Sequence, residues 1–391
     1  MLLPTSGAPA PSGHRPTLAL LVAALGLAAC DSSTPDAPLA PTAAPSHSLA
    51  AAQATPTVFA TGLRFPRGLT FGPDGRLYVA EAGSGGTIST RPSACDQVDP
   101  PVGPYQSGRT ARISRIGPNG NRSTVAFGFP SGINALGDVI GVADVAFLDG
   151  QLYALVAGGG CSHGSRNVPA GIAKVSSTGD WSIVADLSAY LAAHPVANPP
   201  ADFEPDGTWY SMLAVRGKLF AVEPNHGEVA RILPDNWRVS RVVDVSATRG
   251  HIVPTALAQR SGALFFGNLG VFPVELGTEK VFQLAGDGSL TLVKGGFTTV
   301  LGLDFDAQRR MYVLETSHAP GFPTPGAGRV VRLNLDGSRD VIVDGLTFPT
   351  AMRFGPDGRL YISNKGYGPP QPGEILRVDV PGVTPEAIAT N

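Results

Sequence analysis

The 391-residue sequence predicts an all-β protein: a six-bladed β-propeller closed by an N-terminal strand in the last blade. Three observations lead to this prediction. A hairpin motif returns six times, and each copy is followed by further strand-like segments. The composition, with 49 Gly, 36 Pro and only 15% charged residues, is that of a turn-rich globular chain. A repeat of about 40–50 residues with four strands per unit is typical of propellers.

The hairpin is clearest in its first and last copies. FPRGLTFGPDGRLYVAEAG (65–83) and FPTAMRFGPDGRLYISNKG (348–366) are identical at eleven of nineteen positions. In both, an apolar run leads into GPDG and then into an alternating run. Pro presets φ, Asp bonds its own backbone and Gly accepts a positive φ, so GPDG is a turn signal. An apolar run, a tight turn and an alternating run together predict a β-hairpin.

The six copies define the six blades. Their second strands begin at Leu77, Leu152, Leu219, Leu264, Met311 and Leu360, and the next residue is always Tyr or Phe. Each copy leads into a third strand, such as ARISRI or RVVRL, and four copies continue through a turn into a fourth. The segment 186–194, DLSAYLAAH, is the one convincing helical pattern, and we expect a connector helix there between blades two and three.

The sixth copy has no clear fourth strand after EILRVDV. The N-terminal TVFATGLRFP resembles VIVDGLTFP, the segment that precedes the sixth hairpin. We therefore expect the strand that begins at Thr57 to supply the outer strand of blade six. This closure would protect sheet edges that otherwise invite aggregation.

Residues 1–56 are expected to lie outside the propeller domain (57–391). In residues 1–30, His14 and Arg15 precede a short apolar run, which is typical of an export signal and too short to span a membrane. The run ends in Leu-Ala-Ala-Cys, which resembles the bacterial lipobox and implies a lipidated Cys30 on an extracytoplasmic, membrane-anchored lipoprotein. An ordinary cleaved signal is the alternative. Residues 31–56 are rich in Ala, Pro and Ser and predict a disordered tether.

Export affects how the two remaining cysteines are interpreted. Cys95 and Cys161 lie in insertions after the second strands of blades one and two, on the same side of adjacent blades. In an oxidising compartment such a pair is expected to form a disulfide. The alternative is a metal site that also uses His163, but it would have three ligands and no CxxC spacing.

The charge pattern restricts the partners. The net charge is −2 and the chain has no run of Lys or Arg, so nucleic acid is not expected as a partner. We expect a monomer that contacts the membrane through its lipid anchor and binds an unidentified small molecule or protein.

The long insertions all follow second strands, which places them on one face of the propeller. They are 82–111, 157–170, 269–279, 316–328 and 365–373. We call this side the decorated face, and the opposite side, which has only tight turns, the plain face. Loops that grow on one face of a rigid scaffold commonly carry binding. These loops contain the aromatic residues Tyr105, Phe272, Phe322 and Tyr367.

A polar position also recurs on the decorated face. The fifth residue of the second strands is Glu81, Val156, Glu223, Asn268, Glu315 and Asn364. These acids and amides have two readings. Each side chain can bond loop backbone at the end of its strand. Together they can form an oxygen-rich rim that binds calcium or a polyol.

The first strands of the blades enter the channel from the decorated face. Their entrance residues are Arg67, Ala143, Ser211, Pro254, Leu301 and Thr350, with Asp144 next to one of them. Lactonase-type propellers hold a metal here with Glu, Asn and Asp, and one basic group without a carboxylate fits that role poorly. The loop histidines lie outside any nucleophile or metal motif and are interpreted as solvated or structural. They are His163, His226, His251 and His318.

Residues 57–380 resemble the ScyD/ScyE family, which is named for proteins of a sunscreen-pigment pathway. The matching stretches include GLRFPRGLTFGPDGRLYVAEAG, ADVAFLDGQLYALV, VPTALA with LGVFPVELG, GFTTVLGLDF and GLTFPTAMRFGPDGRLYISNKG with GEILRV. The match is weak in blade three, and blade four has GNL in place of the usual GEL. The resemblance implies a secreted or periplasmic propeller and little about chemistry. Two functions therefore stay open: ligand binding or scaffolding through the decorated face, and metal-dependent hydrolysis of lactonase type.

Overall fold

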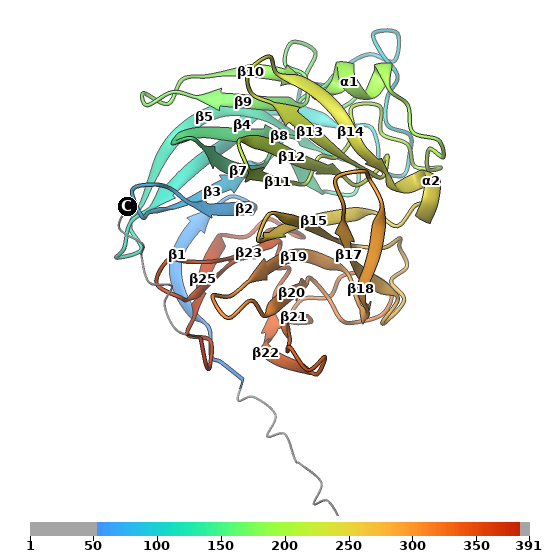
Figure 1. Cartoon of the computed structure of the whole chain (residues 1–391). Coiled ribbons are helices and arrows are strands. Elements are labelled where there is room, and N and C mark those ends of the chain that lie inside the picture. Colours follow the sequence, from blue (N-terminus) through green and yellow to red (C-terminus); the bar gives the residue numbers. More distant parts are fainter. Residues whose placement is uncertain (1–52, 384–391) are drawn as a thin grey trace, which may run out of the picture. The chain divides into compact units, whose positions relative to one another are not determined.

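A computed structural model describes residues 53–383, which form six antiparallel sheets around a central axis (Figure 1). The innermost strand of each sheet contacts the innermost strands of the sheets on both sides, so the six sheets form a closed ring. The prediction of an all-β, six-bladed propeller is confirmed. The signal, Cys30 and residues 31–52 of the predicted tether lie outside the described residues; residues 53–56 are described, and Ala54 N donates to Ile342 O at 2.7 Å.

The blades follow one another in chain order. Blade one contains β2 (Pro66–Phe71), β3 (Leu77–Glu81), β4 (Gln106–Ile116), β5 (Arg122–Ile133) and β6 (Val139–Ile140). Blade two contains β7 (Val142–Leu148), β8 (Gln151–Val156), β9 (Gly171–Val175) and β10 (Trp181–Asp186). Blade three contains β11 (Ser211–Val215), β12 (Lys218–Glu223), β13 (Glu228–Leu233) and β14 (Arg238–Asp244).

The second half of the ring repeats this plan. Blade four contains β15 (Pro254–Arg260), β16 (Ala263–Asn268), β17 (Glu279–Leu284) and β18 (Leu290–Phe297). Blade five contains β19 (Val300–Phe305), β20 (Met311–Glu315), β21 (Gly328–Leu333) and β22 (Arg339–Leu346). Blade six contains β23 (Ala351–Phe354), β24 (Leu360–Asn364), β25 (Gly373–Val378) and β1 (Thr57–Leu63).

The N-terminal strand β1 is the outer strand of blade six. It pairs antiparallel with β25, with Thr57 opposite Arg377 and Leu63 opposite Gly373. The two ends of the propeller therefore share one sheet, and the first and last hairpins are neighbours in space (Figure 1).

The repeated aromatic residue of each hairpin has a packing role. In four blades its ring packs edge-on against a Phe from the first strand of the next blade. The pairs are Tyr78–Phe147, Phe265–Phe305, Tyr312–Phe354 and Tyr361–Phe71, with ring centres 4.8–5.1 Å apart. Such edge-to-face contacts add about 0.5–1.5 kcal/mol each beyond simple burial. The aromatic repeat thus joins one blade to the next.

Two short helices lie between blades. The expected connector is α1 (Leu187–Ala193), capped by the side chain of Asp186, which accepts from Ala189 N at 2.8 Å. A second helix, α2 (Val245–Arg249), begins after Asp244 in the same way and was not expected, because five residues carry too little periodicity. No helix within residues 53–383 is both long enough and apolar enough to cross a membrane.

The insertions of blades one and two are joined by the predicted disulfide between Cys95 and Cys161. The bond excludes the alternative metal site, because neither sulfur is a free thiolate. The sulfurs close a loop of 66 residues in sequence, for which chain entropy alone gives an upper figure of about 4 kcal/mol. The bond fits an extracytoplasmic protein, since disulfides persist in oxidising compartments.

Candidate binding cavity at the channel mouth

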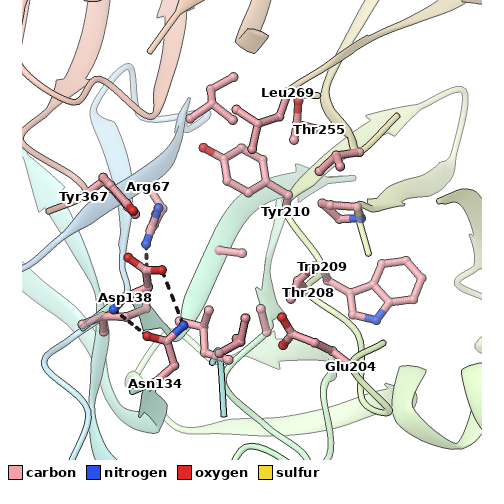
Figure 2. Close-up of a pocket in the computed structure, with 18 of the residues that line it drawn as sticks. Arg67, Asn134, Asp138, Glu204, Thr208, Trp209, Tyr210, Thr255, Leu269 and Tyr367 are labelled. Atoms are coloured by element: carbon pink, nitrogen blue, oxygen red, sulfur yellow. Dashed lines mark hydrogen bonds between the residues drawn. The ribbon is translucent and has the colours of Figure 1, made fainter. Parts of the chain in front are cut away.

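A cavity of about 310 Å³ opens on the decorated face at the mouth of the central channel. Every blade contributes to its wall, either through its first strand or through a loop. The lining residues with functional groups or large side chains include Arg67, Tyr105, Asn134, Asp138, Glu204, Thr208, Trp209, Tyr210, Thr255, Leu269, Phe272, Leu301 and Tyr367 (Figure 2). Three of the four loop aromatic residues singled out in the sequence, Tyr105, Phe272 and Tyr367, line the cavity.

Tyr210 lies across the channel. It immediately precedes β11 of blade three, and its hydroxyl donates to Thr350 O, 2.8 Å away, at the start of the first strand of blade six. Blades three and six are opposite each other in a ring of six. Desolvation of the partly buried Tyr210 hydroxyl raises its pKa well above the usual value, so the side chain stays a neutral donor. This bridge helps to separate the cavity from the channel interior.

The channel interior is closed by a charged cluster. Arg353 lies 3.6 Å from Asp304, and its charge also acts on Asp144. Asp144 accepts from Met212 N and Val145 N, both at 2.8 Å, so it is held by backbone. Gly68 faces this carboxylate so closely that an added Cβ would lie 1.9 Å from an Asp144 oxygen. A void of about 20 Å³ lies beside this cluster, lined in part by Asp144 and Arg353.

One side of the cavity is polar around Arg67, which β2 presents at the channel entrance. Its guanidinium donates to Val139 O at 2.6 Å and, among residues 53–383, no carboxylate lies in ion-pair contact with it. Asp138 and Asn134 belong to the turn between β5 and β6, where Asn134 Oδ1 accepts from Asp138 N at 2.8 Å. Burial and the neighbouring Asp138 carboxylate raise the pKa of Tyr367 to about 12. Figure 2 shows these four side chains together on one wall.

The opposite polar group is centred on Glu204. Tyr105 Oη donates to Glu204 Oε2 at 3.2 Å, and His163 Nε2 lies 3.4 Å from the same oxygen. His163 Nδ1 donates to Gly159 O at 2.7 Å, so its other ring nitrogen faces the carboxylate. Burial alone would lower the pKa of His163, but the hydrogen bond and charge of Glu204, with Asp206 nearby, raise it instead. When His163 is protonated, its charge compensates that of Glu204.

The remaining wall and the rim are apolar. Val102, Val139, Ile140, Trp209, Val253 and Leu301 are among the lining residues. At the rim, Phe272 and Phe322 stack with ring centres 5.8 Å apart, and the loops that carry them pair through Val274 and Gly321. Phe272 is 44% exposed and Phe322 70%. Exposed aromatic rings beside a cavity are a common feature of binding sites.

The recurring strand-end acids do not line this cavity. Each is buried at the end of its second strand and bonded within its own blade. Glu81 accepts from Arg64 N and is ion-paired with Arg112 and Arg122. Glu315 accepts from Thr298 N at 2.5 Å and pairs with Arg329.

The other members of this set are bonded in the same way. Glu223 accepts from the backbone N–H of Thr208, Asn225 and His226. Asn364 accepts from Thr347 N, and Asn268 accepts from Lys280 N and donates to Ile252 O. In blade two the equivalent residue is Val156, which has no side chain to use in this way.

These bonds explain why the polar residue recurs. In blades one, five and six the bonded N–H belongs to Arg64, Thr298 and Thr347. The residue that follows each of these has a left-handed backbone conformation: Phe65 at φ 50°, Thr299 at φ 47° and Phe348 at φ 47°. Non-glycine residues are strained there, so the turn into the first strand needs support. The geometry favours the reading in which each side chain bonds its own loop.

The described residues offer no metal centre of the lactonase type. Within residues 53–383 no three His, Cys, Asp or Glu side chains gather in a way that could hold a metal ion. The channel entrances carry Arg67, Ala143 and Leu301 at the cavity, as the sequence indicates. The donor set thus does not fit a metal at the channel mouth.

The loop histidines take structural positions. His163, His226 and His318 each place a ring nitrogen 2.5–2.8 Å from a backbone carbonyl, and His251 lies 3.5 Å from Asp202. Two of these contacts, His163–Glu204 and His251–Asp202, connect a histidine to a carboxylate that lines the cavity.

Sequence reasoning missed Tyr210, Asn134, Asp138 and Glu204. Glu204 begins the turn EPDG, in which Gly207 N donates to Glu204 O at 2.8 Å. The same PDG signal marks plain-face hairpins elsewhere, so the motif predicts a turn but not its side of the ring. Asn134 and Asp138 bracket another tight turn, and its placement over the channel depends on the short strand β6.

No protein-family model and no curated protein sequence matches the chain. Solved structures do match. A structural-genomics protein provisionally assigned as a gluconolactonase superposes with a TM-score of 0.51 at 15% identity, over 86% of this chain and 99% of that one. A Thermus thermophilus protein provisionally assigned as an oxidoreductase, a glucose dehydrogenase, gives 0.51 at 17% identity, over 83% and 100%.

A luciferin-regenerating enzyme gives a TM-score of 0.51 at 11% identity, over 85% of this chain and 98% of that one. The chain thus has the fold of the gluconolactonase-like six-bladed propellers. At these identities the similarity concerns the fold.

Proposed function

We propose that this chain is an exported small-molecule-binding protein whose ligand occupies the channel-mouth cavity. The cavity itself is the observation that carries the proposal. It has apolar walls, a volume of about 310 Å³ and a small number of polar side chains held in place by hydrogen bonds. This combination is characteristic of small-molecule sites.

The proposal includes attachment to a bacterial membrane through a lipid on Cys30. The apolar run before Leu-Ala-Ala-Cys and the Cys95–Cys161 disulfide support export. The repeats shared with the ScyD/ScyE family support membership of that group of exported propellers. A monomer is part of the proposal, and nucleic acid is not among the expected ligands.

A hydrolase of lactonase type is the second candidate. Glu204 favours it, because a carboxylate beside a buried imidazole on a cavity wall can accept and return a proton. The fold similarity to gluconolactonase-like propellers is compatible with this candidate. The described residues do not supply the metal ligands on which such hydrolases depend.

Binding is tested with phenylnaphthylamine, an uncharged apolar dye that fluoresces when it leaves water. We expect it to bind the parent protein. Ala143→Phe fills the cavity from β7 and should weaken binding by about tenfold or more, since one bulky ring removes most of the contact area. The control is Ala307→Phe on a plain-face turn, which should bind as the parent does. Equal binding by the parent and Ala143→Phe would contradict the proposal.

The hydrolase candidate is tested by incubating the parent with gluconolactone and phenyl acetate, with and without added calcium or zinc. Turnover that disappears in Glu204→Gln would establish catalysis at this cavity. No turnover under any condition would leave binding as the function and remove the hydrolase.

A further inference from the structure

We infer that the natural ligand is an anion with a planar apolar body, whose acidic group pairs with Arg67 while its ring lies toward Phe272. This inference rests on the proposed binding function and names its ligand class. It follows from the balance of charges in the cavity and from the positions of Arg67 and Phe272 in the ring.

The acidic groups of the cavity already have partners. Glu204 accepts from Tyr105 Oη and lies 3.4 Å from His163 Nε2. Asp202 lies 3.5 Å from His251, and its side chain is 59% exposed to water. Asp138 is next to Asn134 and Tyr367. A cationic ligand would have to compete with these groups for each carboxylate.

Unlike Glu204 and Asp202, which each lie beside a histidine, Arg67 has no ion-pair partner within residues 53–383. A guanidinium carries five N–H donors; Arg67 donates to the neutral carbonyl of Val139 and also interacts with the neutral hydroxyl of Tyr210. The Arg67 side chain is half-buried at the cavity wall. A partly desolvated guanidinium with free donors is suited to a carboxylate, sulfonate or phenolate, which it can bind through two parallel hydrogen bonds.

The apolar contacts lie across the axis. Arg67 belongs to blade one and Phe272 follows β16 of blade four, so the two are on opposite sides of a six-bladed ring. Between them the cavity is lined by Leu301, Leu269 and the ring of Tyr210. A ligand that touches both ends is therefore elongated, with its charge at one end and its ring system at the other.

The test compares two dyes that share one ring system: anilinonaphthalene sulfonate, which is an anion, and uncharged phenylnaphthylamine. We expect the parent to bind the sulfonate about tenfold or more tightly, because a charge-assisted hydrogen bond contributes about 1.5–3 kcal/mol. Arg67→Met should remove this preference, so that the two dyes bind the variant with similar affinities. Arg67→Lys, which keeps the charge, should retain part of the preference.

Arg216→Met is the matched control. Arg216 also donates to one backbone carbonyl, that of Ser261, but on a plain-face turn, so its replacement should change neither affinity. Melting curves establish that each variant folds. If Arg67→Met does not fold, the salt dependence of dye binding to the parent tests the inference instead. The preference of the parent for the sulfonate should shrink as the salt concentration rises.

The outcomes separate the two proposals. If both dyes bind the parent equally and Ala143→Phe weakens both, the cavity binds apolar molecules but the anionic class is wrong. A sulfonate preference that persists in Arg67→Met would also overturn the role of Arg67. If neither dye binds the parent, the proposed function itself fails.

Discussion

Asp144 lies in the channel interior, where its carboxylate is fully buried against Arg353 and three hydrogen-bond donors. Burial raises the pKa of Asp144 to about 6, against 3.8 for an ordinary Asp, although Met212 N and Arg353 oppose the rise. The folded state therefore holds this proton more tightly than the unfolded chain. The resulting stabilisation is complete below about pH 4 and is lost as the pH rises through about 6.

Asp144→Asn is expected to show this loss directly. The variant is less stable than the parent at pH 4, because its amide has one acceptor oxygen for three donors. The difference in free energy of unfolding should narrow by about 2 kcal/mol between pH 4 and pH 7, since only the parent has a carboxyl to ionise in the channel. Urea unfolding at several pH values measures it. A gap that stays constant with pH would contradict the expectation.

Asp287→Asn is the control for the sign of this effect. Asp287 is exposed on a plain-face turn, and hydrogen bonds from Ser289 lower its pKa. The stability that the ionised Asp287 contributes is therefore lost as the pH falls. The difference in free energy of unfolding between the parent and Asp287→Asn should shrink toward low pH.

At the scale of single elements, the end of each second strand is tied to the turn that begins its blade. Glu315 at the end of β20 accepts from Thr298 N and pairs with Arg329 on β21, so it joins the turn, the second strand and the third strand. The same arrangement in blade one uses Glu81, Arg64 N and Arg112. These contacts fix the position of the first strand and, with it, the residues that face the cavity.

Glu315→Ala should lower the free energy of unfolding by about 3 kcal/mol, because it leaves Arg329 and a buried N–H without their partner. Glu315→Gln should lose less, because its amide oxygen still accepts. Glu275→Ala, an exposed acid on the same face, is the control and should stay within about 0.5 kcal/mol of the parent. Chemical denaturation measures all three.

Calcium distinguishes the two readings of the strand-end acids. With these carboxylates bonded within their blades, added calcium should leave the melting temperature of the parent and of Glu315→Gln unchanged. A rise in the parent that shrinks in Glu315→Gln would instead support a cation-binding rim.

At the scale of the whole molecule, the ring is closed by non-covalent contacts between its two ends. Strand β1 covers the edge of β25, and Leu63 is buried with Tyr361 and Ile375 in a cluster that also contains Leu69 of blade one. The junction between blades six and one therefore depends on a strand that comes first in the chain. The cavity depends on it too, because Arg67 and Tyr367 come from these two blades.

Deletion of Thr57 to Gly62 should cause aggregation or a large loss of thermal stability. It exposes the β25 edge and removes burial of Phe59 and Ala60, on the order of 2 kcal/mol for a large side chain. Deletion of residues 31–52 is the control and is expected to melt as the parent does. Light scattering and melting curves measure both. A β1 deletion that stays monomeric and melts like the parent would contradict the closure role.

The sequence alone determined the six blades, the decorated face, the disulfide and the connector helix, because each depends on local patterns or on the order of repeats. The aromatic at the second position of the hairpin strand recurs because in four blades it packs against a Phe of the next blade. The strand-end acids were found because they too recur at one position of the repeat. The sequence could not decide whether they bond their own loops or form a cation-binding rim.

Only the tertiary structure decided which side chains form the cavity. Tyr210 reaches Thr350, 140 residues away in sequence, and Glu204 meets His163 and Tyr105 from different insertions. These residues lie in irregular loops that have no repeat, and their direction depends on how the ring closes and how the insertions pack. A pattern of strands fixes where a channel is, whereas the chemistry of its mouth depends on long-range contacts that no local pattern contains.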